Sequence, residues 1–324
     1  MKGSRIFRIA EFLVLLILLM VLAEKVMDYF VKNDYETKTS IIASGTLNAD
    51  ILIQGASRVE FGLNSAIPEK RFNLICYNTG INGSTIDEQL AALKLYLKNN
   101  KKPSYLFLEV TPLCLDKDQS SFHSSFFVPF LGDTDIASIV KREDILQYRL
   151  RYIPLLKYSL YNSFLIRKFV SGVKQKIKKR HTEKEGLYHG FRNFMLTWDG
   201  SFDELKEKNP NGMYFKLDNQ KVQSLNDYLA FAHENKISLI LYEAPIWKEA
   251  APFYKNHDSI ADIISQMAAK YDYPYISFKD LPMNGTKSNF ANSMHLTSHG
   301  ADVFTNIFCE TFSERLKKLR LKNQ

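Results

Sequence analysis

The chain has 324 residues with 45% hydrophobic content, so it can bury a substantial core and has room for about two domains. Its formal net charge of +8 favours anionic surroundings but does not choose among nucleic acid, glycan and lipid headgroups. Cys76, Cys114 and Cys309 have no metal-ligand spacing, and no phosphate-loop or dinucleotide motif occurs. The sequence therefore predicts neither a metal site nor a cofactor.

The N-terminus carries Lys2, Arg5 and Arg8, followed by an unbroken apolar run from Phe12 to Ala23. This pattern favours a single membrane anchor over residues 1–30, although twelve apolar residues are short for a full span. A cleaved signal peptide is the alternative, because the end of the run fits a small-residue cleavage rule. In both cases the positive-inside rule predicts that the chain after about residue 30 is extracytoplasmic.

A polar linker is expected over residues 31–48, and a strand–turn–helix–strand pattern follows it. Buried strands are predicted at Ala49–Gln54, Phe72–Tyr77 and Tyr105–Val110, with a helix at Ile86–Asn99 before the third strand. Strands that alternate with helices over about sixty residues are typical of a parallel α/β sheet.

The same alternation resumes near Val222. It predicts a helix to about Glu234, a strand from Ile237, a helix over 259–271, a strand from Tyr273, and one final helix from Thr297 through Leu319. The α/β domain is therefore expected over 49–115 and 217–324, interrupted by a mostly helical, aromatic and basic insertion over 116–216.

Seven Lys or Arg residues of this insertion lie between Arg167 and Arg180. A solvated face is the first interpretation of this run, and a contact to anionic glycan or lipid is the alternative. Nucleic acid is not an expected partner outside the cytoplasm.

Four polar segments should meet at one edge of the predicted sheet, because ligands of parallel α/β sheets gather at the carboxyl ends of the strands. They contain Ser57, the 78–84 turn, residues 109–112, and residues 292–295 with His295. A serine, a histidine and an amide or carboxylate at one edge suit nucleophilic acyl transfer, in which backbone N–H groups hold the oxyanion. A helix-capping role is the alternative for Ser57.

Three sequence blocks resemble those of SGNH hydrolases, the GDSL-type esterases and acyltransferases. "GASR" resembles the first block, with Ser57 as the nucleophile and its N–H as one oxyanion donor; "NTGINGST" resembles the second, with the N–H of Gly83 as the other oxyanion donor. "NSMHLTSHGADVFT" resembles the last block and puts His295 in the position of the base. The resemblance covers the predicted sheet and implies a three-layer α/β fold.

The blocks depart from the family pattern at three places. Ala56 stands where the family has an aspartate, and "LEVTPL" replaces the Gly-x-Asn block, with Thr111 as the nearest substitute donor. Asn292 occupies the position of the triad carboxylate. The site is then a Ser–His dyad with a weak orienter, a triad completed by a carboxylate elsewhere, or a site that binds without turnover.

Three further residues near these blocks have two interpretations each. Arg58 is expected to pair with an acid rather than bind an anionic substrate, Glu109 to assist the site or to pair with Arg58, and Asn78 to act as a support or an ordinary turn residue.

The layout of one anchor and an extracytoplasmic SGNH-like domain is similar to the D-alanylation protein of the teichoic-acid pathway and to acetylation proteins of exopolysaccharide systems. This resemblance implies a cell-envelope esterase or O-acyltransferase that acts on an acylated glycan or polymer beside a membrane-bound O-acyltransferase. The alternative is a degenerate relative that binds glycan or scaffolds that partner.

Overall fold

The structure is a computed structural model that describes residues 2–322 except 36, 120–121, 179–186 and 194–196. The chain forms two compact units. The helical unit comprises Met1–Thr46, Ala91–Asn99 and Phe122–Thr182. The sheet unit comprises Leu47–Leu90, Asn100–Ser121 and Glu183–Gln324. The segment predicted as one insertion thus contributes residues to both units.

The helical unit begins with α1, which is long and apolar enough by composition to cross a membrane; a signal sequence would have the same properties. Residues 5–18 of α1 are solvent-exposed, and its last turns pack against α8. The predicted 31–48 segment contains a buried helix, α2. The elements of this unit are α1 Lys2–Lys32, α2 Lys38–Ala43, η2 Ser124–Phe126, η3 Val128–Phe130, α6 Thr134–Glu143, α7 Ile145–Leu150, η4 Leu156–Tyr158 and α8 Asn162–Ile177.

The sheet unit is built around five strands, all of them parallel, in the order β2-β1-β3-β6-β7. This arrangement confirms the predicted α/β class. The strands are β1 Ile51–Gln54, β2 Cys76–Asn78, β3 Tyr105–Glu109, β6 Leu239–Glu243 and β7 Tyr275–Ser277.

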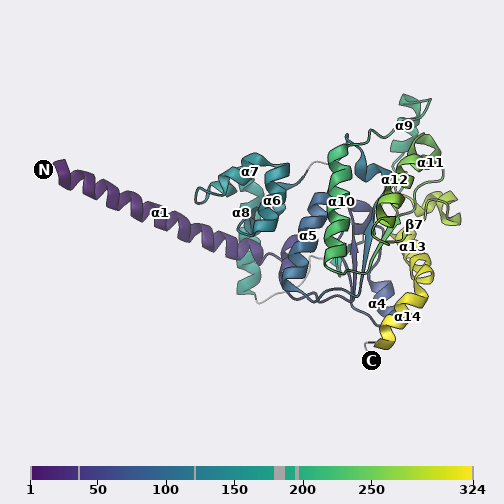
Figure 1. Cartoon of the computed structure of the whole chain (residues 1–324), viewed down its shortest axis with the longest axis horizontal. Helices are drawn as coiled ribbons and strands as arrows, with labels where there is room; N and C mark the ends of the chain where they lie inside the picture. The colour runs from purple at the N-terminus through teal and green to yellow at the C-terminus, as the bar shows by residue number, and fades with distance from the viewer. Residues whose placement is uncertain (1, 36, 120–121, 179–186, 194–196, 323–324) are drawn as a thin grey trace. The chain divides into compact units, whose positions relative to one another are not determined.

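Helices cover both faces of this sheet, as Figure 1 shows for α10 on one side and α13 on the other. Alternate side chains of the strands point to opposite faces. Ile53 and Phe107 pack in one apolar cluster with Phe304 and Phe308 of α13. On the opposite face, Gln54 accepts a hydrogen bond from the Tyr228 hydroxyl of α10. The unit therefore has three layers.

Two helix boundaries of the sheet unit differ from those that the sequence predicts. Asn73 adopts a left-handed conformation (φ 54°) that ends α4, so Phe72, predicted in a strand, is the last residue of a helix. The predicted single C-terminal helix is two helices that meet at Phe312. The helices are α3 Ser57–Glu60, α4 Ala66–Phe72, α5 Ile86–Asn99 (shared with the helical unit), η1 Pro112–Leu115, α9 Ser201–Lys208, α10 Asn219–Glu234, α11 Ala250–Phe253, α12 His257–Ala269, η5 Pro282–Gly285, η6 Lys287–Asn289, α13 Ser298–Thr311 and α14 Ser313–Lys322.

A small hairpin lies against the edge strand β2. It consists of β4 Leu187–Tyr188 and β5 Phe191–Arg192. The carbonyl of His189 at its turn accepts a hydrogen bond from the N–H of Asn78 (2.8 Å). Gly190 has φ +79°, and a Cβ there would lie 1.9 Å from the Asn78 carbonyl oxygen, so the close approach requires glycine.

Candidate active site

Strand β1 leads directly into the turn that carries Ser57. Gly55 is needed in this turn because a Cβ there would lie 2.4 Å from Cγ2 of Val59. Ser57 is the first residue of α3, and the N-cap position belongs to Ala56, which makes no side-chain capping bond. The Ser57 hydroxyl therefore does not cap the helix, which leaves it available to His295.

Ser57, His295 and Asn292 form a continuous hydrogen-bonded chain. Oγ of Ser57 lies 2.8 Å from Nε2 of His295, although 238 positions separate them in sequence. Nδ1 of His295 lies 3.0 Å from Oδ1 of Asn292. The structure thus brings together the three residues that the sequence predicted as the centre of the site.

The hydrogen bonds around Asn292 determine the tautomer of His295. Oδ1 of Asn292 accepts from the backbone N–H groups of Met294 (3.0 Å) and His295 (2.9 Å). Since backbone N–H groups only donate, this atom must be the amide oxygen. Nδ1 of His295 therefore carries the proton, and Nε2 accepts from the Ser57 hydroxyl, as a general base requires.

Asp199 extends this chain by one residue that the sequence did not predict. Its Oδ2 accepts from Nδ2 of Asn292 at 3.4 Å, and its N–H donates to the carbonyl of Ala291 at 2.8 Å. Partial burial opposes its ionisation, but hydrogen bonds from Ser201 and Asn292 outweigh this effect and lower the pKa of Asp199. A carboxylate is thus present behind the amide, not in contact with the imidazole.

His295 is neutral at ordinary pH. Burial lowers its pKa, and the positive charge of Arg58 lowers it further, while Asp199 partly opposes the shift. The resulting pKa is about 4. An imidazole that is unprotonated at neutral pH can accept the proton of Ser57 without first losing one of its own.

Arg58 and Glu109 form a buried ion pair beneath Ser57, with Nη1 and Oε1 3.2 Å apart. Nη2 of Arg58 also donates to the carbonyls of Ala244 (2.6 Å) and Pro245 (3.1 Å). Burial raises the pKa of Glu109, and the charge of Arg58 opposes this shift. These contacts hold the guanidinium in place, where its charge also acts on His295.

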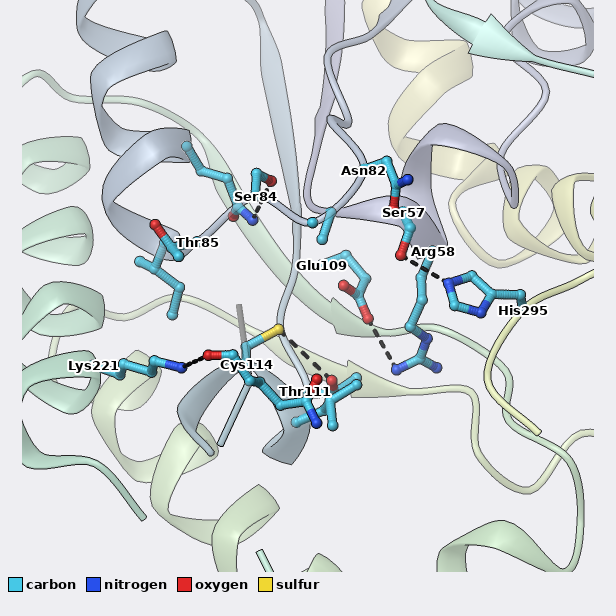
Figure 2. A pocket seen from close by; sticks show the side chains of 16 residues that line it. Ser57, Arg58, Asn82, Ser84, Thr85, Glu109, Thr111, Cys114, Lys221 and His295 are labelled. Carbon is cyan, nitrogen blue, oxygen red and sulfur yellow. Dashed lines mark hydrogen bonds and ion pairs between the residues drawn. The ribbon is translucent and has the colours of Figure 1, made fainter. Parts of the chain in front are cut away.

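A cavity of about 230 Å³ opens beside Ser57 and His295, entirely within the sheet unit. Figure 2 shows Ser57, Arg58 and His295 on one side of it. Nζ of Lys221 donates to the carbonyls of Asp116 (2.6 Å) and Gln119 (2.5 Å), which fixes the loop on the far side. The lining residues are Ala56, Ser57, Arg58, Asn82, Gly83, Ser84, Thr85, Ile86, Gln89, Glu109, Thr111, Leu113, Cys114, Gln119, Lys221 and His295.

Two predicted oxyanion donors, Ser57 and Gly83, line this cavity. Ser57 begins α3, so its N–H has no intrahelical partner. Gly83 has φ +73°, a left-handed conformation that glycine adopts readily. Thr111 also lines the cavity, but it is buried, and its hydroxyl lies 3.7 Å from Sγ of Cys114.

Asn78 lies apart from this cavity. Its side chain is fully buried, and Nδ2 donates to the carbonyls of Val59 (2.7 Å) and Leu63 (2.8 Å). Its Oδ1 accepts from the N–H of Gly80 (2.9 Å). The structure therefore places Asn78 where it holds the end of α3 and the following turn, not where it contacts a substrate.

Another histidine, the buried His257, begins α12 near the ends of β6 and β7. Nε2 of His257 lies 2.8 Å from Oε1 of Glu243, and Nδ1 lies 3.1 Å from Oδ1 of Asp258. Glu243 also accepts from the Ser277 hydroxyl at 2.6 Å. Burial opposes a charge on His257, but hydrogen bonds to the two carboxylates outweigh it and raise the pKa of His257.

The sequence offered little signal for two parts of this site. Asp199 lies in the segment assigned to the insertion, in no recognisable motif, and reaches the site only through the fold. The carbonyls that accept hydrogen bonds from Arg58 belong to a loop after β6. Every residue has a backbone carbonyl, so the sequence does not indicate which ones bind a side chain. Among the described residues, no group of three or more His, Cys, Asp or Glu side chains could hold a metal ion.

Comparisons with known proteins give structural neighbours only: no protein-family model and no curated protein matches the chain. A protein of Bacteroides fragilis described as a candidate acylhydrolase is 11% identical, with a TM-score of 0.39 over 82% of this chain and 87% of its own. A Streptococcus pneumoniae protein described as a candidate platelet activating factor is 11% identical, with a TM-score of 0.38 over 95% and 98% of the two chains. Similarity this low assigns no function to this chain.

The fold and the site together define a parallel α/β protein with a hydrogen-bonded serine, histidine and asparagine at the carboxyl edge of its sheet. The chemistry of these groups is the basis of the functional conclusion that follows.

Proposed function

We propose that this protein is a serine esterase or O-acyltransferase of SGNH type that acts on an acylated glycan or polymer of the cell envelope. The contact that carries the proposal is the 2.8 Å hydrogen bond between Ser57 and His295. Asn292 holds the imidazole in the tautomer that accepts a proton from the hydroxyl.

The reaction begins when Oγ of Ser57 attacks the acyl carbonyl and Nε2 of His295 takes the hydroxyl proton. The N–H groups of Ser57 and Gly83 hold the negative oxygen of the tetrahedral intermediate. The intermediate collapses, His295 returns the proton to the departing oxygen, and the acyl group stays on Ser57 as an ester. Water or an acceptor hydroxyl then attacks this ester by the same route in reverse.

The imidazolium that forms in each step has no carboxylate in direct contact. Asn292 presents an uncharged oxygen to Nδ1, and the carboxylate of Asp199 lies behind Asn292 and contacts its Nδ2. In serine triads, replacing the aspartate by asparagine costs on the order of 10⁴ in rate. We therefore expect slow turnover of simple esters, with acceleration by remote contacts of the true substrate.

The substrate class and the location belong to this proposal as well. The apolar helix α1 fits an anchor, and the basic residues before its apolar run favour an extracytoplasmic sheet unit. A membrane-bound O-acyltransferase would be the partner that supplies or receives the acyl group.

A fluorophosphonate probe tests the proposal directly, because it labels only a serine that is activated as a nucleophile. We expect labelling of the full-length protein in detergent and none of the Ser57→Ala variant. Ser84, which also lines the cavity, provides the matched control: Ser84→Ala should still be labelled.

The second candidate function is a degenerate relative that binds an acylated glycan or scaffolds an acyltransferase. The amide at Asn292 in place of a carboxylate is the observation that favours it. Absence of probe labelling in wild-type protein that is folded and binds glycan would support this alternative over the enzyme.

A further inference from the structure

The end of α1 is fastened to a loop of the helical unit by a cluster of charged groups. Nζ of Lys157 lies 3.1 Å from Oε1 of Glu24 and 2.8 Å from Oδ1 of Asp28. The N–H of Leu155 donates to Oε2 of Glu24 at 2.7 Å, and the Tyr158 hydroxyl donates to Asp28. Residues 155–158 therefore sit beside one particular turn of α1.

That turn marks the end of the part of α1 that can lie in lipid. Residues 9–23 precede Glu24 and carry a single charge, Glu11, near their start; at 1.5 Å per residue they span about 22 Å, and the long side chains of Arg5 and Arg8 before them can reach the headgroups of a bilayer with a ~30 Å hydrocarbon core. From Glu24 onward, the helix packs against other elements of its own unit. The fastened loop thus lies within about one helical turn of the hydrocarbon boundary.

The surface at this level is apolar and exposed. Tyr152 is 66% exposed and Ile153 is 51% exposed, although both are large apolar or aromatic side chains. Leu155 follows these two residues and precedes η4. Its backbone is left-handed (φ 65°), a conformation that a leucine rarely adopts, and in this conformation its N–H donates to Glu24. The exposed apolar side chains of this surface, which we call the α7–η4 surface, are Ile145, Leu146, Tyr152, Ile153, Leu156 and Leu160.

Cationic and aromatic groups accompany these side chains. The guanidinium of Arg151 lies 4.2 Å from the ring centre of Tyr148 and 4.8 Å from that of Tyr152. Residues 141–160 contain five Lys or Arg and two acids, Glu143 and Asp144; Lys157 is buried against Glu24 and Asp28, so the positive groups available to a ligand are Lys141, Arg142, Arg149 and Arg151. Exposed aliphatic side chains, tyrosines and excess positive charge are the composition of surfaces that lie in the headgroup layer of anionic membranes.

We propose that the α7–η4 surface docks into the lipid headgroup layer at the end of α1, so that the helical unit lies on the bilayer and is not merely tethered above it. The occupant is lipid, because the surface continues directly from the boundary of the apolar helix and its charge complements anionic headgroups. This proposal is independent of the catalytic one.

An environment-sensitive probe at Ile153 tests the docking in the full chain. We would label Ile153→Cys with nitrobenzoxadiazole in a Cys114→Ser background, since Cys76 and Cys309 are buried, and reconstitute it in nanodiscs of phosphatidylcholine and phosphatidylglycerol. Thr134→Cys is the control, exposed in the same unit at the start of α6. We expect blue-shifted emission from position 153 and loss of most of its intensity when the lipids carry nitroxide, with neither change at position 134.

Equal emission and equal quenching at the two positions would overturn the proposal. So would a probe at position 153 that is solvent-exposed in nanodiscs but shielded in native membranes, because that result would indicate a protein partner. Hydrogen exchange supplies a second readout: amides of residues 145–160 should exchange more slowly in wild-type nanodiscs than in a Tyr152→Glu/Ile153→Glu variant. Unchanged exchange in β1 and β3 would show that the variant is folded.

Discussion

Two histidines of the sheet unit, the half-buried His295 and the buried His257, have pKa values shifted in opposite directions because their surroundings differ. Burial and the nearby charge of Arg58 lower the pKa of His295 to about 4, and its two direct partners, a hydroxyl and an amide oxygen, carry no charge that would oppose the shift. His257 lies between two carboxylates, which raise its pKa despite burial.

The difference shows which roles of a carboxylate an amide can take over beside a histidine and which it cannot. Asn292 orients the imidazole of His295 through an oxygen whose identity is fixed by two backbone donors. It supplies no charge, so the imidazolium is not stabilised. Glu243 lies beside His257 and raises its pKa, which favours the protonated imidazolium of an ion pair over the neutral imidazole that a general base needs.

The largest effect is expected on the rate of ester hydrolysis, which should depend on His295 and not on His257. His295→Gln should lower the rate of p-nitrophenyl acetate hydrolysis by the full-length protein on the order of 10³-fold, because Ser57 loses its base. His257→Gln should leave the rate within a few-fold of wild type. If both variants lost activity equally while remaining folded, the contrast between the two histidines would not concern catalysis.

Glu243→Gln should break the His257 pair and lower the free energy of unfolding by about 3 kcal/mol, because it leaves a buried charge without its partner. The raised pKa of His257 also makes stability depend on pH. The stabilisation of the folded state by protonated His257 is complete below the pKa of about 6.5 that the histidine has in the unfolded chain. It is lost as the pH rises through the higher pKa that His257 has in the folded protein.

This prediction is tested by following unfolding with circular dichroism at pH values below the unfolded pKa of His257 and above its folded pKa. Wild type should lose stability toward alkaline pH, and Glu243→Gln should lose less. Asp258→Asn is the control: its exposed carboxylate should matter less. Equal stability of wild type and Glu243→Gln at every pH would contradict the conclusion that Glu243 raises the pKa of His257.

Asn292→Asp should raise the pKa of His295, because the imidazole would then contact a carboxylate as His257 does. In wild type, the rate should stay constant from neutral pH down to about pH 5 and fall as His295 becomes protonated near its pKa of about 4. A carboxylate at Nδ1 should raise the acid limb by roughly one to three pH units and increase kcat about tenfold at neutral pH; the gain should be smaller than about 10⁴ because Asn292 already holds His295 in the catalytic tautomer.

Because the new carboxylate would face Asp199 across 3.4 Å, the double variant Asn292→Asp/Asp199→Asn is the matched control and should gain more. A pH–rate profile that does not move in either variant would show that His295 is not the titrating base.

The smallest effect is expected for Asp199→Asn. Its charge acts on His295 through Asn292 from a partly exposed position, so kcat should fall only a few-fold, with KM unchanged. The acid limb should also move to lower pH, because the carboxylate raises the pKa of His295. Asp203→Asn, in the same segment, should change neither quantity.

The buried strands and the amphipathic helix over 86–99 could be predicted because their patterns are local: β1, β3 and β6 are continuous apolar runs, and α5 repeats its apolar residues at helical spacing. The convergence of Ser57 and His295 follows from topology, since parallel strands deliver their following loops to one edge. These parts of the structure needed no knowledge of side-chain contacts.

Contacts between distant segments could not be predicted from these patterns. The break at Phe312 divides an apolar stripe that has a continuous helical period, and the end of α4 depends on one left-handed residue, Asn73. Asp199 belongs to no periodic segment, and only the packing of its backbone against Ala291 puts it behind Asn292. Hydrogen bonds of this kind depend on the assembled fold.

The hairpin at the edge of the sheet has a consequence for copies of this protein that share a membrane. An uncovered edge strand invites another chain to extend the sheet. The N–H of Asn78 in β2 is already paired with His189, and Gly190 lies against its carbonyl. In the membrane-anchored form proposed above, neighbouring molecules would share a plane at high local concentration, where aggregation through exposed strand edges would be most rapid, and the hairpin obstructs this route at β2.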